Sequence, residues 1–140
     1  MRVAALDFGK ARIGVAVSDE LGLLAHPRPF LPARNRKAAL AALRLLQQAE
    51  GIKRFLVGLP RRLGGEAGST ADEVIRFAQE MSDLTGCEVE LVDERLSTVQ
   101  ASRALREGGL SSKEQRGRVD SAAAAILLQA WLDAPGRRKA

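Results

Sequence analysis

Acidic residues stand at three points where strands or helices are expected to begin or end. Asp7 follows the apolar run at 3–6, the pair Asp93-Glu94 ends another apolar strand, and Asp120 opens an alanine-rich helix. A carboxylate at the tip of a buried strand is costly unless a metal ion, an arginine or a ligand meets it. With no histidine or cysteine nearby, three carboxylates suit a Mg²⁺ or Mn²⁺ site that acts on phosphates.

Two of these acids, Asp93 and Asp120, also have a purely structural explanation. Consecutive strand residues point to opposite faces, so Asp93 and Glu94 are not both expected at one site. Asp93 could instead cap the following turn or pair with Arg95. Asp120 taken alone would be a helix N-terminal acid stabilised by the helix dipole. The presence of the other acids makes a shared site the favoured interpretation of Asp120.

Basic residues and glycines supply candidate contacts to phosphate. The loop from Gly58 to Ser69 is rich in glycine and precedes a helix, and glycines let backbone amides approach an anion. Such a loop alone is more often a flexible connection, and it lacks the Gly-Lys-Ser/Thr ending of a Walker A loop. Arg95 could hold a substrate phosphate or tie down a carboxylate. The full set of candidates is Lys10, Arg12, Arg61, Arg62, Gly65 and Arg95.

The order of predicted elements is βββαβαβα, with a small extra helix before the last one. Strands are predicted at 2–8, 12–18, 22–31, 54–58 and 88–93, and helices at 35–50, from Thr70 to Gly86, from Ser97 to Gly108, and from about Val119 to Asp133. Prolines make the third strand an edge strand. Because right-handed crossovers cover both sheet faces, the first strand should be central. Asp7 should then lie near the ends of the 54–58 and 88–93 strands, where ligands bind in open α/β sheets.

The composition indicates one globular domain, with residues 1–136 forming it and residues 137–140 forming a basic tail. The chain has 140 residues and a net charge of +5, and residues 95–140, with nine basic and four acidic side chains, carry the whole excess. This basic third suits RNA or DNA, although a solvated cationic surface explains it equally well. The single cysteine and the lack of a signal-peptide or membrane-span pattern predict a cytoplasmic protein.

Four segments, in order and spanning nearly the whole chain, share a family pattern. They are Asp7-Phe8-Gly9 with the run from Arg12 to Asp19; Val57-Gly58-Leu59-Pro60 with Gly65; the run from Asp93 to Thr98; and the run from Asp120 to Ala123 with Ile126 to Gln129 and Trp131-Leu132. Together they resemble the YqgF/RuvX family, RNase H-like relatives of the RuvC Holliday-junction resolvases. Members of that family are considered nucleases for the 5′ end of pre-16S rRNA.

The resemblance implies an RNase H-like α/β fold with a central five-stranded mixed sheet flanked by helices. It also implies phosphodiester hydrolysis that depends on Mg²⁺ or Mn²⁺. It assigns the catalytic, metal-binding role to Asp7, Glu94 and Asp120, which favours Glu94 over Asp93 and leaves Asp93 a secondary candidate.

The leading hypothesis is therefore a metal-dependent nuclease that acts on RNA in ribosomal RNA maturation, with a precursor ribosomal subunit as a partner implied by the resemblance. A resolvase for branched DNA is the alternative with the same chemistry, and it would require a homodimer because a four-way junction needs two paired active sites. A nucleic-acid-binding module that does not cleave is the alternative from a different class. Both a monomer and a homodimer remain open.

Overall fold

The computed structural model describes residues 1–9, 12–59, 71–93 and 112–134, with the backbone alone at residue 93 and residues 112–121. Several predicted features lie outside the described residues. They are the loop between 60 and 70 with the Thr70 cap, the short helix expected after Ser97, and the basic tail.

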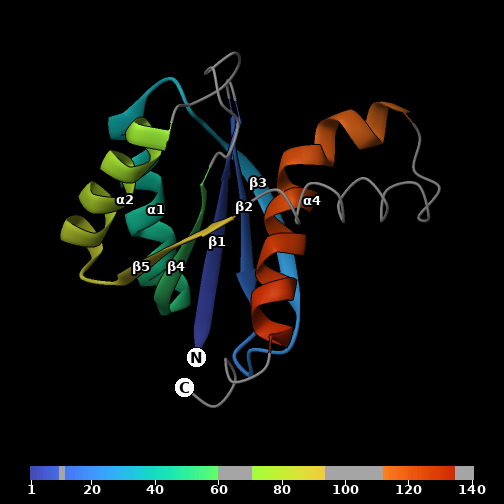
Figure 1. Cartoon of the computed structure of the whole chain (residues 1–140), viewed down its shortest axis with the longest axis horizontal. Helices are drawn as coiled ribbons and strands as arrows, with labels where there is room; N and C mark the ends of the chain where they lie inside the picture. The colour runs from blue at the N-terminus through green and yellow to red at the C-terminus, as the bar shows by residue number, and fades with distance from the viewer. Residues whose placement is uncertain (10–11, 60–70, 94–111, 135–140) are drawn as a thin grey trace.

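A five-stranded mixed sheet forms the centre of the molecule (Figure 1). Its strands are β1 (Arg2–Phe8), β2 (Arg12–Ser18), β3 (Ala25–Pro32), β4 (Ile52–Leu59) and β5 (Glu88–Asp93), in the spatial order β3-β2-β1-β4-β5. The first three pair antiparallel, and β4 and β5 continue the sheet parallel to β1. The prediction that the first strand is central is confirmed.

The outer strand β3 matches the predicted edge strand. Pro27, Pro29 and Pro32 lie in it, and proline has no backbone N–H to donate to a ladder. The register of β3 against β2 shifts between Ile13 and Val15, which marks a bulge in the pair.

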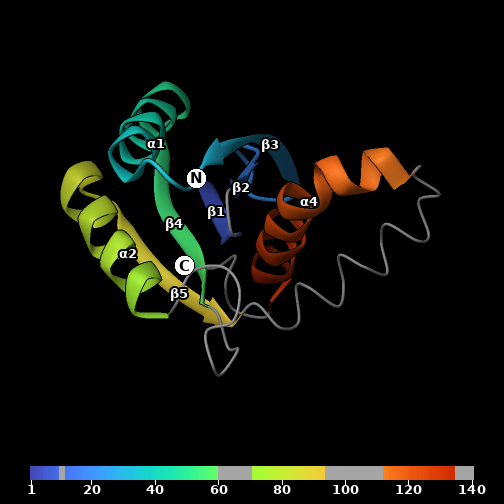
Figure 2. The same cartoon turned by 90° about the horizontal axis from the view of Figure 1, so that it is seen from above.

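Helices cover both faces of the sheet. Of the helices in the described part of the chain, α1 (Arg36–Glu50) and α2 (Ala71–Thr85) lie on one face, and α4 (Ser112–Asp133) lies on the other (Figure 2). Helix α1 begins after Asn35, whose side chain accepts a hydrogen bond from the Ala38 amide. Gly51 and Gly86, after the ends of α1 and α2, have φ values of 65° and 74°, a conformation that glycine adopts without strain.

The alternation of side chains along the strands builds a separate core on each face. Ala4, Leu6 and Val57 belong to the core beneath α1 and α2. The residues in between join the core beneath α4, which contains Val3, Ala5, Ala16, Leu56, Ala124, Leu127, Leu128 and Leu132. The sheet face on which a strand residue lies can therefore be inferred from the core to which the residues two positions away contribute.

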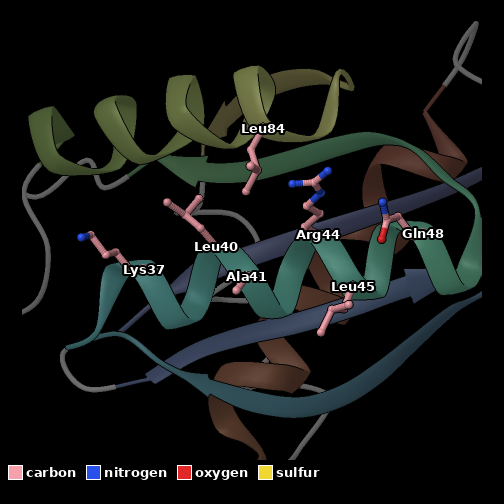
Figure 3. A pocket seen from close by; sticks show the side chains of 7 residues that line it. All are labelled: Lys37, Leu40, Ala41, Arg44, Leu45, Gln48 and Leu84. Carbon is pink, nitrogen blue, oxygen red and sulfur yellow. The ribbon is translucent and has the colours of Figure 1, made fainter.

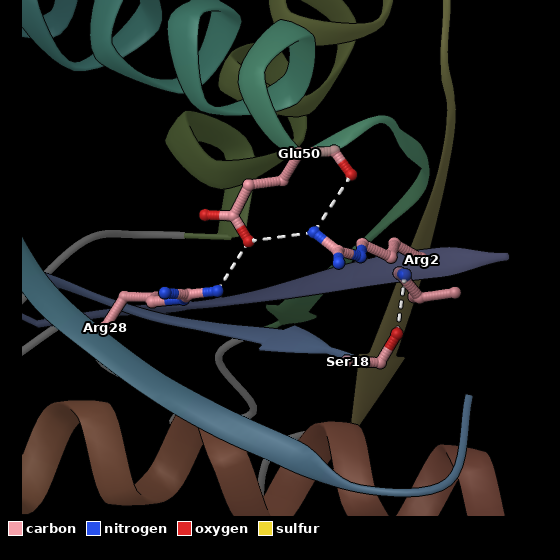
Figure 4. Close-up of polar contacts among 5 residues, drawn as sticks. Arg2, Ser18, Arg28 and Glu50 are labelled. Carbon is pink, nitrogen blue, oxygen red and sulfur yellow. Dashed lines mark hydrogen bonds and ion pairs between the residues drawn. The ribbon is translucent and has the colours of Figure 1, made fainter. Parts of the chain in front are cut away.

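Polar contacts fasten the ends of elements that are distant in sequence (Figure 4). Glu50, at the end of α1, forms ion pairs with Arg2 of β1 and Arg28 of β3. The buried Ser18 hydroxyl accepts a hydrogen bond from the Val3 amide at 2.9 Å. These contacts fix how α1 and β2 sit against the start of the central strand.

The last helix begins earlier than predicted, at Ser112 rather than near Val119. The helix as the structure has it includes Gly117. A single glycine in a helix costs only about 1 kcal/mol, and the preceding lysine, glutamate, glutamine and arginine are good helix formers. Among the residues that the structure describes, no helix is long and apolar enough to cross a membrane.

Candidate functional site

Asp7 lies near the carboxyl end of the central strand, on the face covered by α4. Val3 and Ala5, which alternate in phase with Asp7, pack in the core beneath α4, whereas Leu6 packs beneath α1 and α2. The Asp7 residue is half-buried and does have an interaction partner. A carboxylate at the end of a central strand and beside a covering helix matches the predicted position of the first acid.

Glycines stand beside Asp7 on both neighbouring strands. Gly14 of β2 is its direct partner, and Gly58 of β4 follows Val57, which pairs with Leu6. Both glycines are buried. Since paired residues of neighbouring strands place their Cβ atoms about 4.5–5.5 Å apart, any side chain at these positions would crowd the carboxylate. The sequence did not predict this arrangement, because it depends on strand pairing and not on local spacing.

The second acidic group lies at the same edge of the sheet. Asp93 is the last residue of β5 and pairs with Leu59, the last residue of β4. Val92 packs against the core beneath α4, whereas Val89 packs against the opposite core. Glu94 lies outside the described residues, as does the side chain of Asp93. The backbone therefore brings the ends of β1, β4 and β5 together as predicted, and the choice between the two acids stays a prediction.

The direction of α4 is fixed by contacts near its C-terminal end. The Gln129 side chain accepts a hydrogen bond from the Ala25 amide at 2.9 Å and donates one to the Leu23 carbonyl at 2.8 Å. Ala25 pairs with Ser18, which bonds to Val3 at the start of β1. Helix α4 therefore runs antiparallel to β1, so its earlier residues lie toward the Asp7 end of the sheet (Figure 1).

Asp120 belongs to α4, one turn before the buried Ala124. The nine residues from Gln129 back to Asp120 advance about 14 Å along a helix. Four strand residues, as from Val3 to Asp7, advance about 13 Å. The backbone at Asp120 therefore lies at about the same height along the sheet as Asp7. The side chain of Asp120 is not among the side chains that the structure describes.

Arg12 is the one predicted phosphate contact whose side chain the structure describes. Its guanidinium carbon lies 5.1 Å from the centroid of the Phe30 ring, within the range of a cation–π contact. The Arg12 carbonyl accepts a hydrogen bond from the Gly9 amide at 2.8 Å, so Arg12 and the end of β1 are adjacent. The other candidates, Lys10, Arg61, Arg62, Gly65 and Arg95, lie outside the described residues.

Phe30 contacts a candidate residue but was not itself selected from the sequence. It lies in β3 next to the bulge, about twenty positions from Arg12 in sequence, and only the pairing of β2 with β3 brings the two together. No local motif carries that information.

Asp19 lies at the opposite end of β2, where its side chain stabilises the turn that follows the strand. Its carboxylate accepts hydrogen bonds from the amides of Leu23 and Leu24 at 2.9 and 3.2 Å. The bond from Leu23 is the main reason that the pKa of Asp19 is lowered. Asp19 is thus a useful reference: a carboxylate in the same family pattern, remote from Asp7, whose partners are backbone amides.

Within the described part of the chain, no group of three or more His, Cys, Asp or Glu side chains is arranged to hold a metal ion. Two of the three predicted ligands are not among the side chains described. The donors that the sequence brings to this edge are carboxylates, whose oxygens suit Mg²⁺ or Mn²⁺ better than softer metals.

Known proteins resemble this chain over nearly its whole length. A profile of the family described as "RuvX: Holliday junction resolvase" matches residues 1–134. A protein of Anaeromyxobacter sp. (strain Fw109-5), named "Putative pre-16S rRNA nuclease", is 44% identical over 133 residues, covering 95% of this chain and 97% of that one. A protein of Moorella thermoacetica with the same name is 42% identical over 137 residues, covering 98% of each chain.

Two solved structures share the fold at low sequence identity. RuvC of T. thermophilus, solved in complex with a Holliday junction substrate, has a TM-score of 0.57 at 15% identity and covers 95% of this chain and 96% of its own. The fowlpox virus Holliday junction resolvase has a TM-score of 0.59 at 10% identity and covers 95% and 99%. These likenesses show that the sheet and helices form an RNase H-like fold.

Proposed function

The chain belongs to the RuvX family, and from this membership we propose that it is a divalent-metal-dependent nuclease that hydrolyses phosphodiester bonds of RNA, with the 5′ region of pre-16S rRNA as substrate. The RNA substrate is proposed from the names of the relatives and from the basic C-terminal third. The metal is proposed from the chemistry of the carboxylates.

The observation that carries the proposal is the setting of Asp7. A half-buried carboxylate at the carboxyl edge of the central strand, with a glycine on each flanking strand, is an unusual arrangement for a residue with only a packing role. Open α/β sheets bind ligands at this edge. The glycines keep side chains away from the carboxylate, which would allow an ion or a phosphate group to approach it.

Asp7, Glu94 and Asp120 would hold the metal. When bound, a divalent ion supplies an activated water and charge stabilisation at the phosphate. Two features of the fold support this set of ligands. Val92, two residues before Glu94, packs on the same sheet face as Asp7, and the backbone at Asp120 lies at the same height along the sheet as Asp7. Each acid would thus come from the end of a strand or from a packed helix, which limits its movement.

Arg12 would bind the phosphodiester backbone next to the carboxylates. Its guanidinium offers several N–H donors in a plane that matches phosphate oxygens, and the Phe30 ring limits the orientations that the side chain adopts. Lys10, Arg61, Arg62, Gly65 and Arg95 complete the proposed phosphate-binding set. Together they would position the backbone of the nucleic acid without selecting a base sequence.

The test is cleavage of a labelled RNA that contains the 5′ region of pre-16S rRNA, with Mg²⁺ or Mn²⁺ and with EDTA. We expect cleavage by the wild-type protein with metal and none with EDTA. Asp7→Asn, Glu94→Gln and Asp120→Asn should each reduce the rate by more than the roughly 100-fold that even an outer partner of a metal ligand can cost. Each variant should still bind the RNA.

Two matched variants make this experiment specific. Asp83→Asn makes the same chemical change at an exposed residue of α2, on the opposite face of the sheet, and should leave the rate unchanged. Asp93→Asn distinguishes the secondary candidate from Glu94. Equal activity in wild type and all three carboxylate variants would contradict the metal-nuclease proposal, and RNA binding without cleavage by any of the proteins would favour a binding module.

A resolvase for branched DNA is the second candidate, favoured by the family description and by the fold shared with resolvases. It makes a different prediction about assembly, because two paired active sites must act on one junction. Metal-dependent cleavage of a four-way DNA junction by a stable homodimer, with no cleavage of the RNA, would replace RNA with branched DNA as the substrate.

A further inference from the structure

A groove runs along the outer surface of α1, on the sheet face opposite to α4 and Asp7. Its volume is about 590 Å³. Four apolar side chains form its walls, Leu40, Ala41 and Leu45 from α1 and Leu84 from the end of α2 (Figure 3). Lys37 and Arg44 also line it.

Two of the three leucines of this groove contribute little to the packing of α1 onto the sheet. Leu43 is fully buried and Leu40 is half-buried against the same core, whereas Leu45 is 67% exposed and Leu84 is 38% exposed. Helix α1 therefore has an apolar inner face and a second apolar strip that faces outward. A concave apolar surface of this kind, with charged groups beside it, is typical of a protein interaction site.

The two charged residues that line the groove have the same sign. Lys37 and Arg44 are seven residues apart, which is two helical turns or about 10 Å along one side of α1. Neither forms an ion pair among the described residues, whereas the neighbouring Arg36 is paired with Glu80. Helix α1 contains no acidic residue before Glu50. The groove thus has apolar walls and two cationic side chains that can pair with acidic groups of a bound partner.

We propose that this groove binds an amphipathic helix of a partner protein that presents leucine-like side chains between two acidic residues about two turns apart. The apolar side chains would fill the space between Leu40, Leu45 and Leu84, and the acids would meet Lys37 and Arg44. The proposal does not depend on the nuclease activity, because the groove is formed by α1 and α2 and Asp7 lies on the face covered by α4, and these helices flank opposite faces of the sheet (Figure 2).

Two other occupants fit this surface less well. A second copy that docked the same face in a two-fold dimer would bring Lys37 and Arg44 toward their own counterparts and gain no acidic residue from α1. A nucleic acid backbone would find the two cations but would gain nothing from the exposed leucines. An acidic amphipathic helix uses both features.

The test uses the full chain and two lactam-bridged helical peptides of about 15 residues, a length at which an unconstrained helix is marginal in water. The peptides are identical, with leucines on one face, except that one has two glutamates seven residues apart where the other has two lysines. Fluorescence anisotropy should show saturable binding of the glutamate peptide and binding of the lysine peptide weaker by about tenfold.

Variants of the protein then separate the apolar and the charged contributions. Leu45→Asp should weaken the binding of the glutamate peptide by about tenfold or more, since it removes a leucine from the groove and adds a charge that repels the glutamates. Lys37→Glu with Arg44→Glu should reverse the preference, so that the lysine peptide binds better. Neither change should affect metal-dependent cleavage of RNA, which distinguishes this result from a failure of the proposed nuclease function.

Three outcomes would overturn the proposal. They are the absence of saturable binding by either peptide, equal affinity of the two peptides, and binding that Leu45→Asp leaves unchanged. Light scattering of the wild type and Leu45→Asp tests for a second copy in the groove, and RNA titration of the wild type and the double charge-reversed variant tests for nucleic acid. A dimer lost in the variant would assign the groove to a second copy, and RNA affinity lost in the double charge-reversed variant would assign it to nucleic acid.

Discussion

At the scale of single residues, Asp7 is defined as much by its neighbours as by its own carboxylate. The sequence identifies the acid, because it directly follows an apolar run and is followed by Phe8 and the glycine at position 9. It does not reveal that Gly14 and Gly58 flank the acid, because Gly14 is seven residues away and Gly58 is on a different strand. Pairing between strands is a non-local property that local spacing does not encode.

Gly14→Ala tests whether this side-chain-free setting is needed for cleavage. The added methyl would lie about 5 Å from the Cβ of Asp7 and would compete with the substrate or the metal for space. We expect kcat/KM to fall by about tenfold or more, since small misplacements of reacting groups are costly. Steady-state cleavage of the RNA, alongside the thermal unfolding midpoint, is the measurement. A folded variant with the wild-type rate would show that the glycine has only a packing role.

The candidate site was predictable where the chemistry is local and unpredictable where it depends on tertiary contacts. The end of β1 at Asp7 and the ends of β4 and β5 were expected at one edge, and the sheet order agrees. The contact between Arg12 and Phe30 was not expected, because it arises from the shifted register of β2 and β3.

At the scale of elements, α4 joins the proposed site to the rest of the fold. It packs on the sheet through fully buried side chains such as Leu128 and is fastened at its end by Gln129. It is also the element that would bring Asp120 to the level of Asp7. The stability of α4 on the sheet should therefore affect both folding and activity.

Leu128→Ala should destabilise the protein by about 2–5 kcal/mol, the usual cost of removing a fully buried leucine side chain. Leu45→Ala is the matched control, because the same change at a 67% exposed leucine should alter the free energy of unfolding by less than about 0.5 kcal/mol. Urea denaturation followed by circular dichroism measures both. A similar loss in the two variants would mean that α4 does not pack as described.

Element boundaries were predicted best where the sequence contains explicit termination signals. Gly51 and Gly86 mark the ends of α1 and α2 because both adopt a positive φ. The start of α4 was predicted too late. Gly117 lies inside the helix, and a glycine within a helix and a glycine that ends one look alike in sequence. Strand β4, at Ile52–Leu59, also extends beyond the predicted 54–58, since its ends pair with β1 and β5 outside the most apolar stretch.

At the scale of the whole molecule, charge and apolar surface are unevenly distributed. The excess positive charge is carried by residues 95–140, whereas the exposed leucines of the groove belong to α1 and α2. The proposed carboxylate site lies on the side of α4 and the groove on the side of α1 and α2, so the proposed nucleic acid and the proposed partner helix would bind opposite faces of the sheet. A chain of this size can have both because the sheet separates them.

The affinity for RNA should depend strongly on salt. Each phosphate neutralised by lysine or arginine releases counterions, so six or more contacts would reduce affinity by about 1,000-fold or more between 50 and 200 mM salt. Filter binding of the uncleaved RNA in EDTA measures the slope, and Arg12→Ala should make it shallower by about one phosphate contact. Affinity that is independent of salt would contradict binding through the phosphate backbone.

The two outer strands differ in whether another strand could join them. Strand β3 lacks a backbone donor at Pro27, Pro29 and Pro32, whereas β5 has an amide at every position from Glu88 to Asp93. An additional strand needs a continuous row of donors and acceptors, so β3 is a poor template for one. Addition of a strand at β3, whether in an aggregate or in a complex, is therefore disfavoured. Substitutions that replaced these prolines would restore the missing backbone donors and so allow another strand to pair with β3.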